Sequence, residues 1–230
     1  MDARCALAGH PAAALIGAAA LLLVGFAFAE AEPPDYATTL TEGAGAVIAR
    51  LGREQGSGPA EELAKRWMAT FGPSARVEYE LGLVWRLAGD DARARSHLDA
   101  AARLDPDLAA ARYDRGEVRL AAGDLAGARE DFEAVSRLEP EAWPGWFRLA
   151  ELEGRSGNAR GFETHLLRAF RTGFSVRAVA ADPTWRGFVS HPDVGPVFVR
   201  LVRVYQGEAA LEAIGASEAK PADDVRAPGR

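Results

Sequence analysis

The chain has 230 residues, of which 48% are apolar and 26% charged, so it is long enough to bury a core and is not broadly disordered. Its net charge of −6 argues against a nucleic-acid or anionic-membrane binder, which would need a basic face. The bias toward Ala, Leu, Arg and Glu, with few β-branched runs, predicts an all-α fold.

The amino-terminal segment has the pattern of a targeting sequence. Residues 12–29 contain no charged side chain, their apolar run is centred on Leu21–Val24, and Ala27–Ala29 supplies small residues at the spacing of a cleavage site. We therefore predict a signal peptide over 1–29 and a linker over 30–40. The protein would be exported, periplasmic or secreted, with no membrane insertion after cleavage. The alternative is an uncleaved anchor, because about 18 apolar residues can just cross a bilayer.

An internal repeat of 34 residues dominates the middle of the chain. The pairs Gly89-Asp90, Gly123-Asp124 and Gly157-Asn158 recur at this spacing. Each glycine can adopt the left-handed conformation that ends a helix, and the Asp or Asn after it can cap the next helix. The three pairs therefore predict three helix-turn-helix corners.

Small and large residues recur at the same period, and their pattern resembles the tetratricopeptide repeat (TPR) family. Two successive units carry the resemblance, through Gly82, Ala94, Leu98, Ala101 and Pro106 and through Gly116, Ala128, Phe132 and Pro140. The resemblance implies a TPR-like α-solenoid, a right-handed superhelix of antiparallel helix pairs. In such a fold each pair buries its apolar stripe only against its neighbours.

The repeat frame divides the chain into four units. Residues 75–108 and 109–142 are the regular TPR units. Residues 143–176 form a divergent TPR unit, and 41–74 a divergent first repeat with an atypical turn. Because each hairpin depends on its neighbours for burial, three or more units are needed, and four are available.

The period breaks after the fourth unit. Phe162 and Phe174 already depart from the pattern, since a small residue and a terminal proline are expected at their positions. Residues 177–206 resemble the segment that closes TPR arrays, and 207–230 lack a sustained apolar period, which predicts a largely disordered tail. We call residues 177–206 the capping segment. It is expected to cover the apolar end of the last hairpin with Trp185, Phe188, Val197, Phe198 and Leu201.

In repeats similar to these, the first helix of each pair lines the concave surface and the fifth position of each unit points into it. That position holds Tyr79, Tyr113 and Phe147, which we predict to form a partly exposed aromatic column suited to an extended peptide or a partner helix. The alternative is that the rings pack between hairpins and are covered. The predicted partner-binding groove includes six further residues on this face: Leu83, Arg86, Glu117, Arg148, Glu151 and Arg155.

These features predict a non-catalytic protein-protein interaction scaffold or adaptor of the cell envelope. Its partner would be a protein or peptide, with no nucleic acid and no cofactor. The alternative is a helical enzyme or a small-ligand-binding protein, which requires a closed pocket between the last hairpin and the capping segment. The usual sequence motifs of phosphate, acyl-transfer, zinc-protease and dinucleotide chemistry do not occur.

The strongest constellation for a metal or for catalysis is His97, Asp131 and His165, which share one position of three successive units. We expect this position to face solvent, with its members too far apart for zinc bonds of about 2 Å. Arg115 and Arg119 are expected to extend along a hairpin rim, and the alternative is that they offer a pair of guanidinium groups to an acidic partner. The only cysteine, Cys5, would leave with the signal peptide, so no disulfide or cysteine-based metal site is expected in the mature chain.

Overall fold

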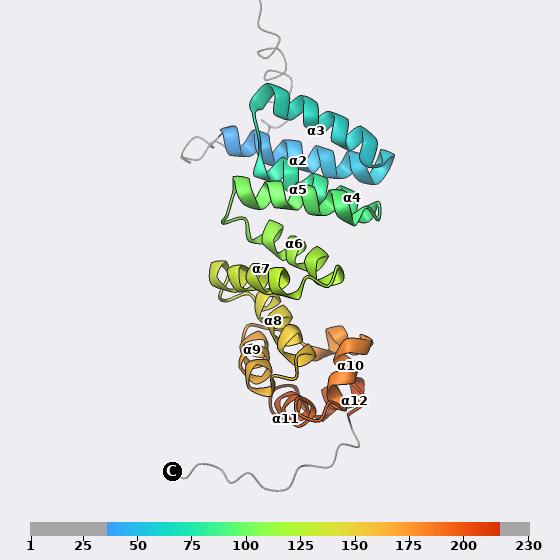
Figure 1. Ribbon diagram of the computed structural model, residues 1–230, viewed down its shortest axis with the longest axis vertical. Helices are drawn as coiled ribbons and strands as arrows, with labels where there is room; N and C mark the ends of the chain where they lie inside the picture. Colours follow the sequence, from blue (N-terminus) through green and yellow to red (C-terminus); the bar gives the residue numbers. More distant parts are fainter. Residues whose placement is uncertain (1–35, 217–230) are drawn as a thin grey trace, which may run out of the picture. The chain divides into compact units, whose positions relative to one another are not determined.

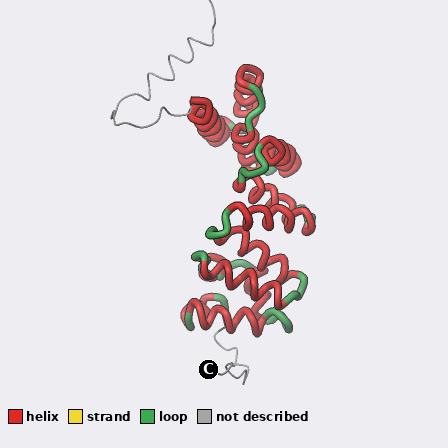
Figure 2. Tube along the Cα trace, turned by 90° about the vertical axis from the view of Figure 1, so that its left-hand side faces the viewer, coloured by secondary structure: helices red, strands yellow, loops and turns green. Residues whose placement is uncertain are grey.

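The computed structural model describes residues 36–216 of a chain that divides into two units, 1–39 and 40–230. The predicted signal peptide or anchor lies outside the described residues, and so does the end of the chain from 217 onward. Within the described range all regular secondary structure is helical, which confirms the predicted all-α class (Figure 2). None of these helices combines the length and the apolar content of a membrane span.

Helices of the second unit stack in chain order as hairpins, so the predicted solenoid of antiparallel helix pairs is confirmed (Figure 1). Within a pair, α4 packs along α5, α6 along α7 and α8 along α9, and successive pairs meet through α5 with α6 and α7 with α8. The described helices are α2 (Tyr36–Gln55), α3 (Ser57–Phe71), α4 (Ala75–Leu87), α5 (Asp91–Leu104), α6 (Ala109–Ala121), α7 (Leu125–Leu138), α8 (Trp143–Arg155), α9 (Ala159–Arg171), the short 3-10 helix η1 (Val176–Val179), α10 (Pro183–Val189), α11 (Gly195–Gln206) and α12 (Glu208–Ala213).

The three predicted corners are confirmed, and their geometry is nearly identical. Gly89, Gly123 and Gly157 have φ angles of 77°, 80° and 74°, in the region that glycine enters without steric cost. The next residue, Asp90 or its counterpart, donates its backbone N–H to a carbonyl five residues back and caps the following helix with its side chain. Sequence-local chemistry therefore sets the hairpin geometry at each corner.

Close helix crossings follow from small residues on the first helix of a pair facing large residues on the second. A Cβ atom added to Gly82 would lie 2.7 Å from Leu98, and one added to Gly116 would lie 2.6 Å from Phe132. Leu98 and Phe132 are fully buried. The glycines are therefore required because the neighbouring side chain fills the space that a methyl group would take.

The first hairpin begins earlier than the repeat frame predicts. Helix α2 starts at Tyr36, so the end of the predicted linker 30–40 is helical. The reason is local, since no glycine or proline interrupts the sequence between Pro34 and Gly43. The atypical turn is a single residue, Gly56, with a φ of 93°.

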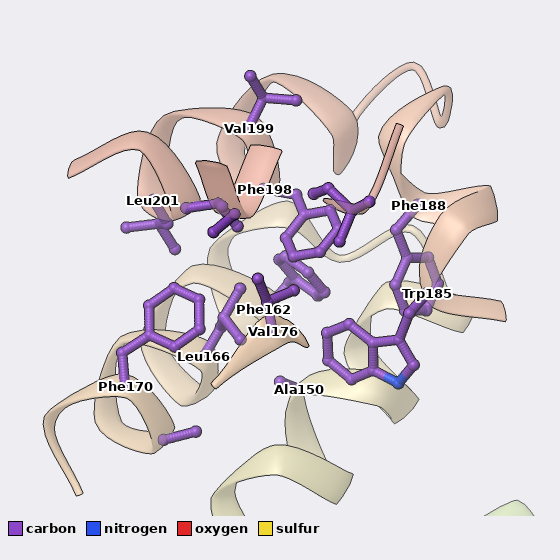
Figure 3. Packing of buried hydrophobic residues seen from close by; sticks show 14 of the residues in the cluster. Ala150, Phe162, Leu166, Phe170, Val176, Trp185, Phe188, Phe198, Val199 and Leu201 are labelled. Carbon is purple, nitrogen blue, oxygen red and sulfur yellow. The ribbon is translucent and has the colours of Figure 1, made fainter. Parts of the chain in front are cut away.

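A capping segment closes the stack beyond α9. Trp185 and Phe188 of α10 and Phe198 of α11 pack on Phe162 and Leu166 of α9, as Figure 3 shows. All are buried, as is Leu201, and Val197 packs against them, so these side chains cover the apolar end of the last hairpin. The repeat pattern expects a small residue at position 162. A phenylalanine fits there because it packs against the aromatic rings of the capping segment rather than against another hairpin.

The prediction of a disordered tail from residue 207 is wrong for its first ten residues. Residues 208–213 form α12, which packs on α11, and the cluster around Trp185 includes Leu211 and Ile214, exposed by 0% and 2%. Two large apolar residues three positions apart are too few to give a visible period, but they suffice to anchor one helical turn. The remainder of the predicted tail lies outside the described residues.

Candidate partner-binding face

The nine residues predicted to bind a partner lie on α4, α6 and α8, the first helices of three successive pairs. The structure places Tyr79, Leu83 and Arg86 on α4, Tyr113 and Glu117 on α6, and Phe147, Arg148, Glu151 and Arg155 on α8. We call this set, together with the neighbouring side chains described below, the first-helix face.

The predicted aromatic column is only partly exposed, and one of its three members is covered. Tyr79 and Tyr113 are half-buried, whereas Phe147 is 4% exposed. The ring of Phe147 stacks on Trp185 with a centroid separation of 4.8 Å and lies 4.5 Å from Phe174. The prediction of an exposed ring is therefore wrong for Phe147, because the capping segment takes the place of a further repeat and covers this position.

Aromatic rings also fill the region between the last hairpin and the capping segment. The alternative function, a helical enzyme or small-ligand-binding protein, requires a closed pocket in this region. Between α9 and the capping segment, Phe162 is fully buried and lies edge-on to Phe188 and Phe198, at centroid separations of 5.5 and 5.7 Å. Trp185 is also fully buried and borders the same cluster. This region is filled by side chains and forms a structural core.

Polar side chains link α4 to α6 across the first-helix face. The hydroxyl of Tyr79 donates to Asp114 at 2.9 Å, and the guanidinium of Arg86 donates to the other carboxylate oxygen at 2.5 Å. Burial, followed by the charge of Asp114, raises the pKa of Tyr79 well above its ordinary value. The hydroxyl therefore stays protonated and acts as a donor throughout the neutral range.

A second set of ion pairs links α6 to α8. Arg148 binds both Glu117 of α6 and Glu151 of its own helix, and Arg155 binds Glu151 at 2.7 Å. Glu151 is only 3% exposed, so it fixes the two arginines rather than meeting solvent. Burial raises the pKa of Glu117, and the charge of Arg148 opposes this rise. Glu117 and Arg148 therefore link two helices, whereas Glu151 and Arg155 form their ion pairs within α8.

An open hollow of about 340 Å³ lies on this face, near the amino ends of α6 and α8. Tyr79 and Tyr113 border it, and Trp143, which is 37% exposed, borders it as well. We call it the aromatic hollow, and its lining residues are Tyr79, Ala109, Ala110, Tyr113, Asp114, Val135, Glu139, Trp143 and Pro144.

Sequence reasoning missed Asp114, Glu139 and Trp143 as members of this site. Asp114 is adjacent to the predicted Tyr113, and its acidic side chain on the partner-facing helix was a usable signal. Trp143 and Glu139 flank the turn between two repeats, and no pattern within either repeat indicates that they share a hollow with Tyr79. Only the stacking of the pairs brings them together.

The repeated position held by His97, Asp131 and His165 does not face solvent, contrary to the prediction. His97 Nδ1 lies 2.7 Å from Glu78 Oε2, Asp131 is 1% exposed, and the ring of His165 stacks on Trp146. Each residue faces the first helix of its own pair, where burial lowers the pKa of His165. Among residues 36–216, no three His, Cys, Asp or Glu side chains are grouped to hold a metal ion.

The prediction that Arg115 and Arg119 extend along a hairpin rim is wrong. Both side chains turn inward and bind Asp131. Arg115 donates to both Asp131 oxygens and, at 3.1 Å, to Asp99, while Arg119 donates to Asp131 at 2.9 Å and to the carbonyl of Gly127. This cluster ties together α5, α6 and α7. These two arginines are therefore not available to bind an acidic partner.

The fold of the described helices is that of known TPR-like helical proteins. The chain is similar to MamA 41-end from Desulfovibrio magneticus RS-1, with a TM-score of 0.51 and 20% identity over 80% of this chain and 97% of that chain. It is also similar to the MamA RS-1 ArsTM double mutant, with a TM-score of 0.52 and 19% identity at the same coverage. No protein-family model and no curated protein sequence matches the chain. At this level of identity the likeness shows the fold alone.

Proposed function

We propose that this chain is a non-catalytic protein-protein interaction scaffold or adaptor of the cell envelope that binds a peptide or partner helix along its first-helix face. The observation that carries the proposal is the aromatic hollow, an open site bordered by the half-buried rings of Tyr79 and Tyr113. Aromatic side chains provide large contact areas at low entropic cost, and they dominate the binding energy of many interfaces.

The ion pairs on this face support the same proposal. Asp114 links α6 to Tyr79 and Arg86 of α4, and Arg148 links α8 to α6. These links hold the hollow in one shape before a partner arrives. A preformed site loses less conformational entropy on binding, so more of the contact energy appears as affinity.

Site-specific crosslinking in the native envelope tests the proposal. A photo-reactive residue at Ala110, which is exposed and lines the aromatic hollow, should form covalent adducts with a partner, whereas one at the exposed Ala126 of α7 should not. Tyr113→Ala should lower the adduct yield about tenfold with little change in helix content measured by circular dichroism.

Tyr205→Ala is the matched control, because it removes an aromatic ring that is 44% exposed on α11, away from the first-helix face. Equal adduct yields from positions 110 and 126, or the same yield with and without the ring of Tyr113, would show that a partner does not bind here.

We also propose that the protein is exported, periplasmic or secreted, with its apolar leader removed near Ala29. The proposal rests on the uncharged run of residues 12–29 and the small residues that end it. Amino-terminal sequencing of the protein isolated from the envelope should begin shortly after residue 29. A chain that still begins at residue 1 would instead support the anchored alternative.

A further inference from the structure

The aromatic hollow is small. Its volume of about 340 Å³ lies at the small end of the range of ligand pockets, about 300–1,000 Å³. Rings from three helices, those of Tyr79, Tyr113 and Trp143, form part of its wall. The hollow can therefore select among the side chains of a bound segment.

The charged residues that line the hollow are both acidic. Asp114 already accepts hydrogen bonds from Tyr79 and Arg86, so its charge is largely compensated. Glu139 is exposed and forms no ion pair with any residue of the range 36–216. No lysine or arginine of the described chain lines the hollow. One formal negative charge is thus left uncompensated at its rim.

Helix ends near the hollow reduce this negative charge but do not reverse its sign. The amino ends of α6 and α8 add partial positive charge, and the carboxyl end of α7, immediately before Glu139, adds partial negative charge. The two amino ends outweigh the one carboxyl end by about half an elementary charge, less than the full charge of Glu139, and the effect falls off within one helical turn. The full charge of Glu139 therefore sets the sign of the site.

We propose that the aromatic hollow receives a lysine or arginine side chain of the partner, an inference that rests on the proposed binding of a protein segment along this face. The aliphatic stem of such a side chain packs on Ala109, Val135 and Pro144. Its cationic head lies against the aromatic rings, whose faces attract cations, and is paired with Glu139. An acidic side chain is repelled by Glu139, and an apolar one leaves that charge uncompensated.

Selection from a displayed library of random peptides, with the full exported chain as bait, tests the inference. Peptides bound by the wild type should share a lysine or arginine at one position, and replacing that residue with norleucine should lower the affinity about tenfold. With Glu139→Gln as bait, the same replacement should lower the affinity less than it does with the wild type, because only the contact of the cation with the rings remains. Glu130→Gln, which removes an exposed carboxylate elsewhere on α7, should behave like the wild type.

Tyr113→Ala separates failure of this inference from failure of the proposed function. Selected peptides that depend on Tyr113 but carry an apolar or acidic residue at the shared position would overturn the basic-side-chain site and leave partner binding intact. The basic-side-chain site is also overturned if replacing the basic residue with norleucine lowers the affinity for Glu139→Gln as much as for the wild type. Peptides whose binding is indifferent to Tyr113 would overturn both.

Discussion

Replacing Trp185 with alanine is expected to lower the free energy of unfolding by about 3–5 kcal/mol, the usual cost of removing a large aromatic side chain from a core. The ring is fully buried, stacks on Phe147 at 4.8 Å and lies 5.3 Å from Phe188 and 5.8 Å from Phe198. It therefore joins α8, α10 and α11 at one point. Denaturant unfolding followed by circular dichroism measures the loss.

Two further variants show whether the loss arises from packing at this point. Trp185→Phe should cost much less, because a ring remains and the indole N–H, which has no hydrogen-bond partner among the described residues, is removed. Tyr205→Ala removes a half-exposed ring from the same capping segment and should cost the least. Hydrogen exchange should show lost protection in α10 and α11 of Trp185→Ala. Unchanged protection there would mean that the segment does not depend on this ring.

Replacing Asp131 with alanine is expected to destabilise the fold by about 3–5 kcal/mol, because it leaves two largely buried guanidinium groups without their main partner. The carboxylate is 1% exposed and accepts hydrogen bonds from Arg115 at 2.5 Å and from Arg119 at 2.9 Å. Removing one member of a buried ion pair costs far more than removing an exposed charge. A thermal unfolding series measures the change.

Asp107→Ala is the matched control, because it removes an exposed carboxylate from the turn between α5 and α6. Its melting temperature should stay close to that of the wild type. Asp131→Asn should fall between the two, since the amide keeps a hydrogen-bond acceptor but loses the charge. If Asp131→Ala has the same melting temperature as Asp107→Ala, the ion pairs of Asp131 with Arg115 and Arg119 contribute nothing to holding α6 against α7.

The fold could be predicted from the sequence because its determinants are local and repeat. Gly89-Asp90 and its two counterparts contain all the chemistry that their corners need, and the glycine at position 82 matches the large residue at position 98 within one hairpin. The capping residues were also recognisable, since Trp185 and Phe188 form a dense apolar group after the last hairpin.

The candidate site was predicted less well, because its properties depend on contacts between different helices. The burial of Phe147 is decided by Trp185, more than one repeat length further along the chain, and the inward turn of Arg115 is decided by Asp131 on the next helix. The 34-residue repeat predicts which face of a helix a residue occupies, but it does not predict which neighbouring helix or side chain covers that residue. For the same reason Glu139 was missed, although Tyr113 was found.

Helix α6 carries residues of two kinds within one short stretch, and this limits how the protein can be redirected to a new partner. Asp114 is bound to α4, and Arg115 and Arg119 are bound to α7, so a change at any of these three sites alters the scaffold as well as the binding. Ala110 of the same helix carries no polar link between helices, and neither does Leu83 of α4. We therefore expect substitutions at such apolar positions to change specificity while leaving the architecture unchanged.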